Sequence, residues 1–149
     1  MSSSIKRLLT LDANVLVAAL KRDEPYSQKC IDILKKMPDW FLLTEPSIIY
    51  QEACGTLARR INLEVAGKAE EFLGKIIHPQ LLVNCNKEFC ISAYPLCRSF
   101  EIYAIDVLYL KVALEREAIL VSLDKEDFVD KVKSKNPTLE VYHVSEFQY

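Results

Sequence analysis

Glycine, proline and histidine are all scarce in this sequence: its 149 residues include only 3 glycines, 6 prolines and 2 histidines. No glycine- or proline-rich linker divides the chain, so we predict a single domain over residues 1–149. The 5 cysteines are odd in number and include no C-x-x-C pair, which argues against a zinc site or a secreted disulfide framework. We expect them to be buried as small hydrophobic side chains, and the sequence leaves open whether any of them pair.

An excess of positive charge and a long apolar run are also missing. The formal net charge is −2, which argues against the strongly basic surface of many nucleic-acid-binding domains. A local basic patch or a bound cation remains open. The apolar run at residues 8–20 is interrupted by Asp12 and Asn14, unlike a signal peptide, and no segment reaches the roughly 18 apolar residues of a membrane span. We therefore expect a cytoplasmic protein with no membrane contact.

Short apolar runs alternate with longer segments of helical periodicity, which is the pattern of an α/β domain. We predict strands at residues 6–11, 40–44, 80–84, 119–123 and 140–144. We predict helices at residues 13–22, 27–37, 46–61, 64–77, 86–100, 102–118 and 125–135, with Thr44 or Glu45 capping the helix that begins at Pro46. This alternation predicts a single three-layer domain with a mostly parallel central sheet and helices on both faces.

Four acidic residues occupy positions that are unusual for a surface acid. Asp12 ends the first predicted strand, and Asp124 directly follows the strand at 119–123. Glu52 and Asp106 have apolar neighbours three and four residues away on their helices. Because ligands bind at the carboxyl ends of parallel strands, these four side chains can converge there. Oxygen ligands without histidine or thiol favour Mg²⁺ or Mn²⁺, which suggests metal-assisted phosphoester hydrolysis.

Each of these acids also has a simpler explanation. Asp12 and Asp124 can cap the helices that follow them. Glu52 and Asp106 can be buried in salt bridges with arginines. Capping does not account for the two acids on helix faces, so we favour one shared site for all four.

A family resemblance rests on four segments that occur in this order: LTLDANVLVAAL, TEPSIIYQEACGTLAR, IYAIDVLYLKVALE and ILVSLDKEDF. They resemble the four motif regions of PIN-domain ribonucleases, and the chain is closest in size to the VapC-type toxin group. The resemblance extends from Leu8 to about Phe128 and implies a PIN-like fold. It also implies a catalytic metal site for one or two Mg²⁺ or Mn²⁺ ions, formed by Asp12, Glu52, Asp106 and Asp124.

The same resemblance implies that three further residues support the metal site or could replace one of its acids. Asn14 and Ser122 match polar positions near the family's site and are expected to support it. Asp127 is a reserve for Asp124, because two residues separate the pair here, whereas the family often has one residue between its last two acids.

The resemblance further implies cleavage of single-stranded or loop RNA, a homodimer and, for a toxin, an antitoxin whose segment occupies the acidic groove. Two alternatives stay open: an RNA-processing nuclease outside any toxin pair, and a catalytically silent PIN-like module that binds RNA or serves as a scaffold.

Other functions have weaker support in the sequence. Metal-free RNA cleavage would need His78 and His143, which share no motif. A phosphorylated receiver domain also gathers acids at strand ends, but Asp106 lies in a predicted helix. Cationic side chains that could rim the groove and touch phosphates are Arg59, Arg60, Lys131, Lys133 and Lys135, although such cations also stabilise helix C-termini.

Overall fold

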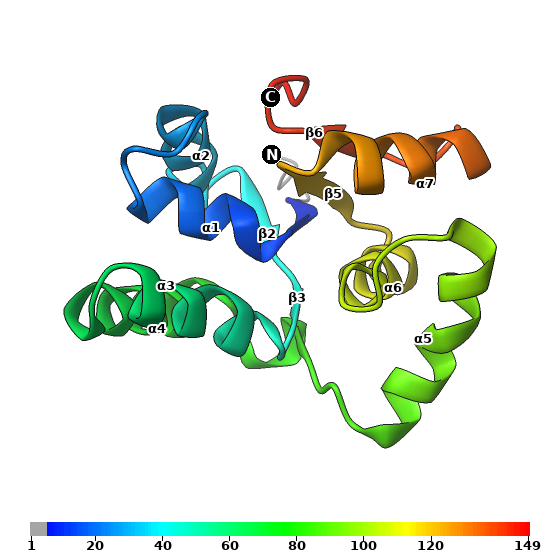
Figure 1. Ribbon diagram of the computed structural model, residues 1–149, viewed down its shortest axis with the longest axis horizontal. Coiled ribbons are helices and arrows are strands. Elements are labelled where there is room, and N and C mark those ends of the chain that lie inside the picture. The colour runs from blue at the N-terminus through cyan, green and yellow to red at the C-terminus, as the bar shows by residue number, and fades with distance from the viewer. Residues whose placement is uncertain (1–5) are drawn as a thin grey trace, which may run out of the picture.

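The computed structural model describes residues 6–149, which form a parallel sheet flanked by helices on both faces (Figure 1). The main sheet has the strand order β2-β1-β5-β6, and every neighbouring pair is parallel. Its strands are β1 (Arg7–Leu11), β2 (Phe41–Leu43), β5 (Ile119–Ser122) and β6 (Val141–His143). A second, two-stranded parallel sheet pairs β3 (Glu45–Pro46) with β4 (Leu82–Val83). The predicted α/β fold is confirmed.

The helices are α1 (Ala13–Leu20), α2 (Ser27–Leu34), α3 (Thr56–Arg60), α4 (Leu63–Ile76), α5 (Lys87–Phe100), α6 (Asp106–Arg116) and α7 (Asp130–Lys135). Turns of π-helix precede α3 at Tyr50–Gly55 and α7 at Lys125–Val129. Helices α1 and α6 both contact β1 and β5, the two central strands. Strands covered in this way read as continuous apolar runs, as "LLTL" and "ILV" do here. None of the helices in residues 6–149 is both long and apolar enough to span a bilayer.

The strand order places a topological switch between β1 and β5. From β1 the chain moves outward to β2, whereas from β5 it moves in the opposite direction to β6. Connections that leave two neighbouring strands in opposite directions open a crevice at the carboxyl ends of those strands. Asp12 follows β1 directly, and Asp124 lies two residues after β5, so both acids stand at this crevice.

The segment after β2 differs from the prediction. Pro46 lies in β3 instead of a first helical turn, and helical structure begins only at Tyr50. Thr44 and Glu45 do not cap a helix. The Thr44 hydroxyl donates to the Leu81 carbonyl over 2.8 Å, and the Glu45 carboxylate accepts from the Leu11 amide over 2.7 Å. The long-range pairing of β3 with β4 overrides the local capping signal, and it also keeps β4 out of the main sheet.

Two smaller expectations also need correction. The helix predicted at 102–118 begins only at Asp106, so Asp106 is the first residue of α6 and does not follow an earlier helical turn. All five cysteines are free, but only Cys30 is buried, and Cys90 is exposed. The prediction that the cysteines act as buried hydrophobic side chains therefore holds for Cys30 alone.

Candidate metal site

A pocket of about 280 Å³ lies at the carboxyl edge of the main sheet and contains all four of the predicted acids. Its acidic side chains come from four separate segments: the end of β1, the π-helical turn before α3, the start of α6 and the segment after β5. The full lining is Asp12, Ala13, Asn14, Val17, Glu52, Thr56, Arg60, Tyr103, Asp106 and Asp124. The fold thus brings together residues up to 112 positions apart in the chain, counted from 12 to 124.

Asp12 is the most deeply buried of the four acids, with 5% of its surface exposed. It precedes α1, but its carboxylate makes no capping hydrogen bond to that helix. Instead, the Ser122 hydroxyl donates to Asp12 Oδ2 over 2.8 Å, and Asn14 Nδ2 donates to the same oxygen over 3.3 Å. Burial raises the pKa of Asp12 to about 6, and the charges of Glu52 and Asp124 act in the same direction, whereas the Ser122 hydrogen bond opposes it.

Ser122 and Asn14 connect the ends of β1 and β5. Asn14 Nδ2 also donates to Ser122 Oγ over 3.3 Å, and Asn14 Oδ1 accepts from the Leu123 amide over 3.1 Å. Ser122 Oγ accepts in turn from the Asp124 amide over 3.0 Å. The two polar residues predicted to support the site therefore hold Asp12 and the backbone of Asp124 in one hydrogen-bonded network.

Asp124 both caps a helical turn and lines the pocket. Its Oδ1 accepts from the Asp127 amide over 3.1 Å and so caps the helical turn that follows β5. Its side chain also lines the acidic pocket. Asp127, the reserve position, is exposed and is not part of the pocket lining.

Glu52 is half-buried, and its carboxylate lies near the hydroxyl of Tyr109 from α6. Burial raises the pKa of Glu52, and the neighbouring hydroxyl partly lowers it again. The Tyr109 hydroxyl is itself buried and has no partner of normal hydrogen-bond geometry among the described residues. The Glu52 carboxylate and the Tyr109 hydroxyl are therefore close neighbours without a hydrogen bond of normal geometry between them.

Among the four pocket acids, Asp106 has the pKa that its surroundings raise most. Burial raises its pKa to about 8, and the charges of the other pocket acids and of Asp127 add to this rise. Because the charges of Asp12, Asp124 and Glu52 all raise the pKa of Asp106, the four carboxylates are close enough to repel one another.

No cation in the described part of the chain offsets this repulsion by pairing with a pocket acid, because none of the ion pairs there includes one of the four. As the side chains stand, no three acid, histidine or cysteine groups within residues 6–149 meet around a common point. Mg²⁺ keeps several waters and needs only one or two carboxylates together with substrate phosphates. An oxygen-only donor set with uncompensated negative charge therefore fits Mg²⁺ or Mn²⁺.

Of the predicted basic rim, only Arg60 reaches the pocket. Lys131 instead donates to the Glu101 carbonyl, and Lys133 lies over the ring of Tyr142. Tyr103 is a pocket residue that the sequence did not predict: it lies three residues before Asp106, is 65% exposed and lines the pocket.

The two histidines do not share a site. His78 is exposed, and its Nδ1 accepts from the Gln80 amide in a turn. His143 is buried at the end of β6, where its ring contacts Ser145 and Tyr26. Neither lines the acidic pocket, so this arrangement does not support metal-free cleavage by a histidine pair.

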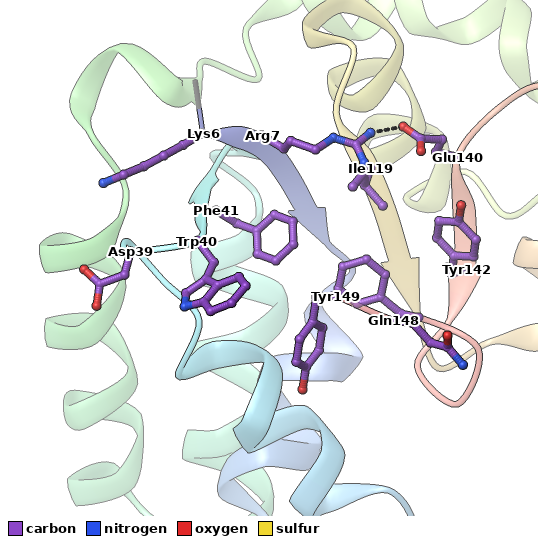
Figure 2. A pocket seen from close by; sticks show the side chains of 11 residues that line it. Lys6, Arg7, Asp39, Trp40, Phe41, Ile119, Glu140, Tyr142, Gln148 and Tyr149 are labelled. Atoms are coloured by element: carbon purple, nitrogen blue, oxygen red, sulfur yellow. Dashed lines mark hydrogen bonds and ion pairs between the residues drawn. The ribbon is translucent and has the colours of Figure 1, made fainter. Parts of the chain in front are cut away.

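A second hollow, of about 460 Å³, lies where the main-sheet strands begin (Figure 2). Aromatic rings dominate it, and Trp40, Phe41, Tyr142 and Tyr149 surround its centre in Figure 2. Its charged residues are of both signs: Arg7 pairs with Glu140, and Lys6 and Asp39 also line the hollow. The Lys36 ammonium lies 4.8 Å from the ring centres of two lining residues, Trp40 and Tyr149. This hollow contains none of the four predicted acids.

Comparison with protein families agrees with this arrangement. The family model described as "PIN domain" matches residues 9–133, which is most of the chain. The chain belongs to the PIN domain family. The match includes all four pocket acids, and it confirms the family resemblance read from the sequence motifs. A search of curated proteins found no match.

Solved structures with the same fold include toxins and toxin–antitoxin complexes. The chain is similar to VapC20 from Mycobacterium tuberculosis, described as a sarcin-ricin loop cleaving toxin, with a TM-score of 0.64 and 13% identity over 79% of this chain and 91% of that one. A toxin–antitoxin complex from Klebsiella pneumoniae gives 0.66 and 14%, covering 93% and 99%. FitAcB from Neisseria gonorrhoeae gives 0.64 and 18%, also covering 93% and 99%. At these identities the likeness shows a shared PIN fold.

Proposed function

We propose that this PIN-domain protein is an endoribonuclease that hydrolyses phosphodiester bonds of RNA with Mg²⁺ or Mn²⁺. The observation that carries the proposal is the convergence of four acids from four chain segments on one pocket, without an ion-pairing cation in the described chain. Structural residues rarely gather uncompensated like charges, because each carboxylate makes its neighbours harder to ionise.

Asp12, Glu52, Asp106 and Asp124 would hold one or two metal ions. When bound, these ions supply an activated water and stabilise the leaving oxygen of the phosphodiester. Ser122 and Asn14 would keep the Asp12 carboxylate aimed into the pocket, since both donate to its Oδ2. Such supporting hydrogen bonds fix the direction in which a ligating carboxylate points.

Arg60 and Tyr103 at the rim suggest how an RNA strand is held. A guanidinium group can bind a phosphate in bidentate fashion, which would offset the repulsion between the RNA backbone and the acids. An exposed tyrosine ring offers a stacking surface for an unpaired base. Both features favour single-stranded or loop RNA, in which bases are free to stack.

We further propose that the protein is a cytoplasmic toxin with a protein antitoxin and that it forms a homodimer, with residues 1–149 acting as one domain. The supporting observation is that one protein of the same fold is described as a toxin and another structure of this fold as a toxin–antitoxin complex. An antitoxin segment that enters the pocket would need cationic side chains to complement the four acids.

The test is cleavage of a panel of labelled RNAs in the presence of Mn²⁺, Mg²⁺ or EDTA. Asp106→Asn keeps the shape of the side chain and removes its charge, so we expect cleavage to fall at least roughly 1,000-fold. Asp127→Asn is the matched control, because Asp127 is a nearby acid that does not line the pocket. Its activity should stay within about threefold of the wild type.

Four outcomes would separate the alternatives. Metal-dependent cleavage lost in Asp106→Asn and kept in Asp127→Asn would support the proposed site. Cleavage that survives EDTA and the Asp106 change would contradict it. Metal binding and cleavage both absent from the wild type would favour a silent PIN module that binds RNA without cutting it. Metal-dependent cleavage by a protein for which no inhibiting antitoxin exists would instead favour an RNA-processing nuclease outside any toxin pair.

A further inference from the structure

Glu45 is a fully buried acid that lies outside the pocket of four acids. It is 0% exposed, belongs to β3 and is absent from the pocket lining. One carboxylate oxygen, Oε2, accepts a hydrogen bond from the Leu11 amide over 2.7 Å, while Oε1 has no partner among the described residues. A buried acid with an unsatisfied oxygen costs stability, and an apolar side chain would avoid that cost. Packing alone therefore does not explain Glu45.

The hydrogen bonds around the end of β1 show which backbone group the Glu45 carboxylate contacts. The Thr44 amide donates to the Leu9 carbonyl over 2.9 Å, which continues the pairing of β1 with β2. Beyond that point the chain turns away into β3. The Thr44 carbonyl then accepts from the Thr10 hydroxyl over 2.9 Å, and the Glu45 carboxylate accepts from the Leu11 amide where a parallel ladder would use a backbone carbonyl.

The last residues of β1 are thus fixed from both sides. On the β5 side, the Asp12 amide donates to the Val121 carbonyl over 2.9 Å. The amides of a parallel strand point to alternate sides, so the amide of the preceding residue, Leu11, faces β3, where it donates to the Glu45 carboxylate. Without it, a buried N–H group would have no partner, and the backbone would shift to find one.

We propose that Glu45 is a positioning residue for Asp12: its buried carboxylate clamps the Leu11 amide and so fixes the backbone that carries Asp12 into the pocket. The metal-binding role of Asp12 in this inference rests on the proposed function. Metal ligands need placement within about 0.5 Å, so a small backbone shift at Leu11 would weaken metal binding.

The experiment compares three variants with the wild type. Glu45→Met preserves the volume and removes the acceptor, whereas Glu45→Gln keeps an oxygen that can accept from the Leu11 amide. Thr10→Val is the matched control, because it removes the neighbouring buried hydrogen bond to Thr44 and leaves the Leu11 amide satisfied. Two quantities are measured on each folded protein: Mn²⁺ affinity by calorimetry, and hydrogen exchange of the Leu11 amide.

We expect Glu45→Met to weaken Mn²⁺ binding by roughly 10- to 100-fold and to speed exchange at Leu11. Glu45→Gln should restore both to within about threefold of the wild type. Thr10→Val should lower the melting temperature but leave Mn²⁺ affinity within about threefold. If Glu45→Met does not fold, Glu45→Asp, which withdraws the acceptor by one methylene, is measured in its place.

Unchanged Mn²⁺ affinity in Glu45→Met would overturn the inference, and so would an equal loss of affinity in Thr10→Val. A wild type that binds no Mn²⁺ would contradict the proposed function instead. In that case, Leu11 exchange still decides about Glu45: fast exchange in Glu45→Met alone supports the clamp, and unchanged exchange rejects it.

Discussion

The two edges of the same parallel sheet differ in the charged residues that they carry and in the partners of those residues. At the carboxyl edge, four acids share one pocket, and mutual repulsion and burial raise the pKa values of Asp12 and Asp106. At the amino edge, Arg7 pairs with Glu140, and Lys36 lies over two aromatic rings. The charged residues that line the amino-edge hollow are of both signs, whereas the carboxyl edge gathers four acids with no ion-pairing cation among the described residues. This difference is the basis for proposing that the carboxyl edge is the functional one.

The comparison predicts that aromatic packing at the amino edge stabilises the fold without affecting chemistry. Phe147 is 7% exposed and packs against the rings of Phe41, Tyr142 and Tyr149. We expect Phe147→Ala to lower the free energy of unfolding by about 3–5 kcal/mol, because it removes a buried aromatic ring. Denaturant unfolding measures this loss. RNA cleavage per folded molecule, measured well below the melting temperature, should be unchanged; a selective loss of cleavage would show that this edge takes part in the reaction.

The carboxyl edge should make the metal-free protein less stable as pH rises. Asp106 has a pKa of about 8 in the folded chain, against an ordinary value near 3.8, so between these values the folded state binds a proton that the unfolded state does not. Its stabilising contribution is fully present below about pH 4 and is lost as pH rises through 8. We expect the melting temperature without metal to fall from pH 5 to pH 8, on the order of 5 °C.

Two controls sharpen this pH prediction. Asp106→Asn should flatten the decline, since the amide does not titrate, whereas Asp127→Asn should leave it in place. Added Mn²⁺ should restore stability at pH 8, because it binds the folded, deprotonated acids. A decline that is equally steep in Asp106→Asn would show that other groups govern the pH dependence.

The smallest effect is expected from the ion pair at the amino edge. The side chains of Arg7 and Glu140 are 56% and 45% exposed, so solvent screens their attraction. Glu140→Gln should change the free energy of unfolding by less than about 1 kcal/mol and leave cleavage within experimental error. Thermal unfolding at low and high salt would check this, and a large loss that disappears at high salt would mean that the pair is less screened than its exposure implies.

The fold class and the four pocket acids could be predicted because both follow from local patterns that are visible in one sequence. Apolar runs such as "ILVS" and "FLL" indicate buried parallel strands, and their ends place Asp12 and Asp124 at one edge. The periodicity predicts a helix from residue 102, whereas α6 begins at Asp106, and the predicted convergence of Asp106 with the other three acids is confirmed by the pocket. Helix boundaries depend on capping and packing that periodicity does not encode.

Glu45 illustrates what single-chain patterns do not reveal. The local signal, an acid directly before Pro46, matched a helix cap, and a cap is a short-range interaction. Its actual partner is the Leu11 amide, 34 residues earlier in the chain. An acid between an apolar strand and a proline, with no lysine or arginine nearby, was the available hint that Glu45 is buried.

The sequence by itself determined which residues carry negative charge at the ends of apolar strands and on inward helix faces, because these are properties of local order and periodicity. Only the tertiary structure decided that the four acids share one pocket, that Arg60 and Tyr103 join it, and that Glu45 holds the end of β1. These contacts join segments 34 to more than 100 residues apart, and they form only when the strands and helices pack. The physical reason is that a site is defined by distances in space, which chain order constrains only within each element.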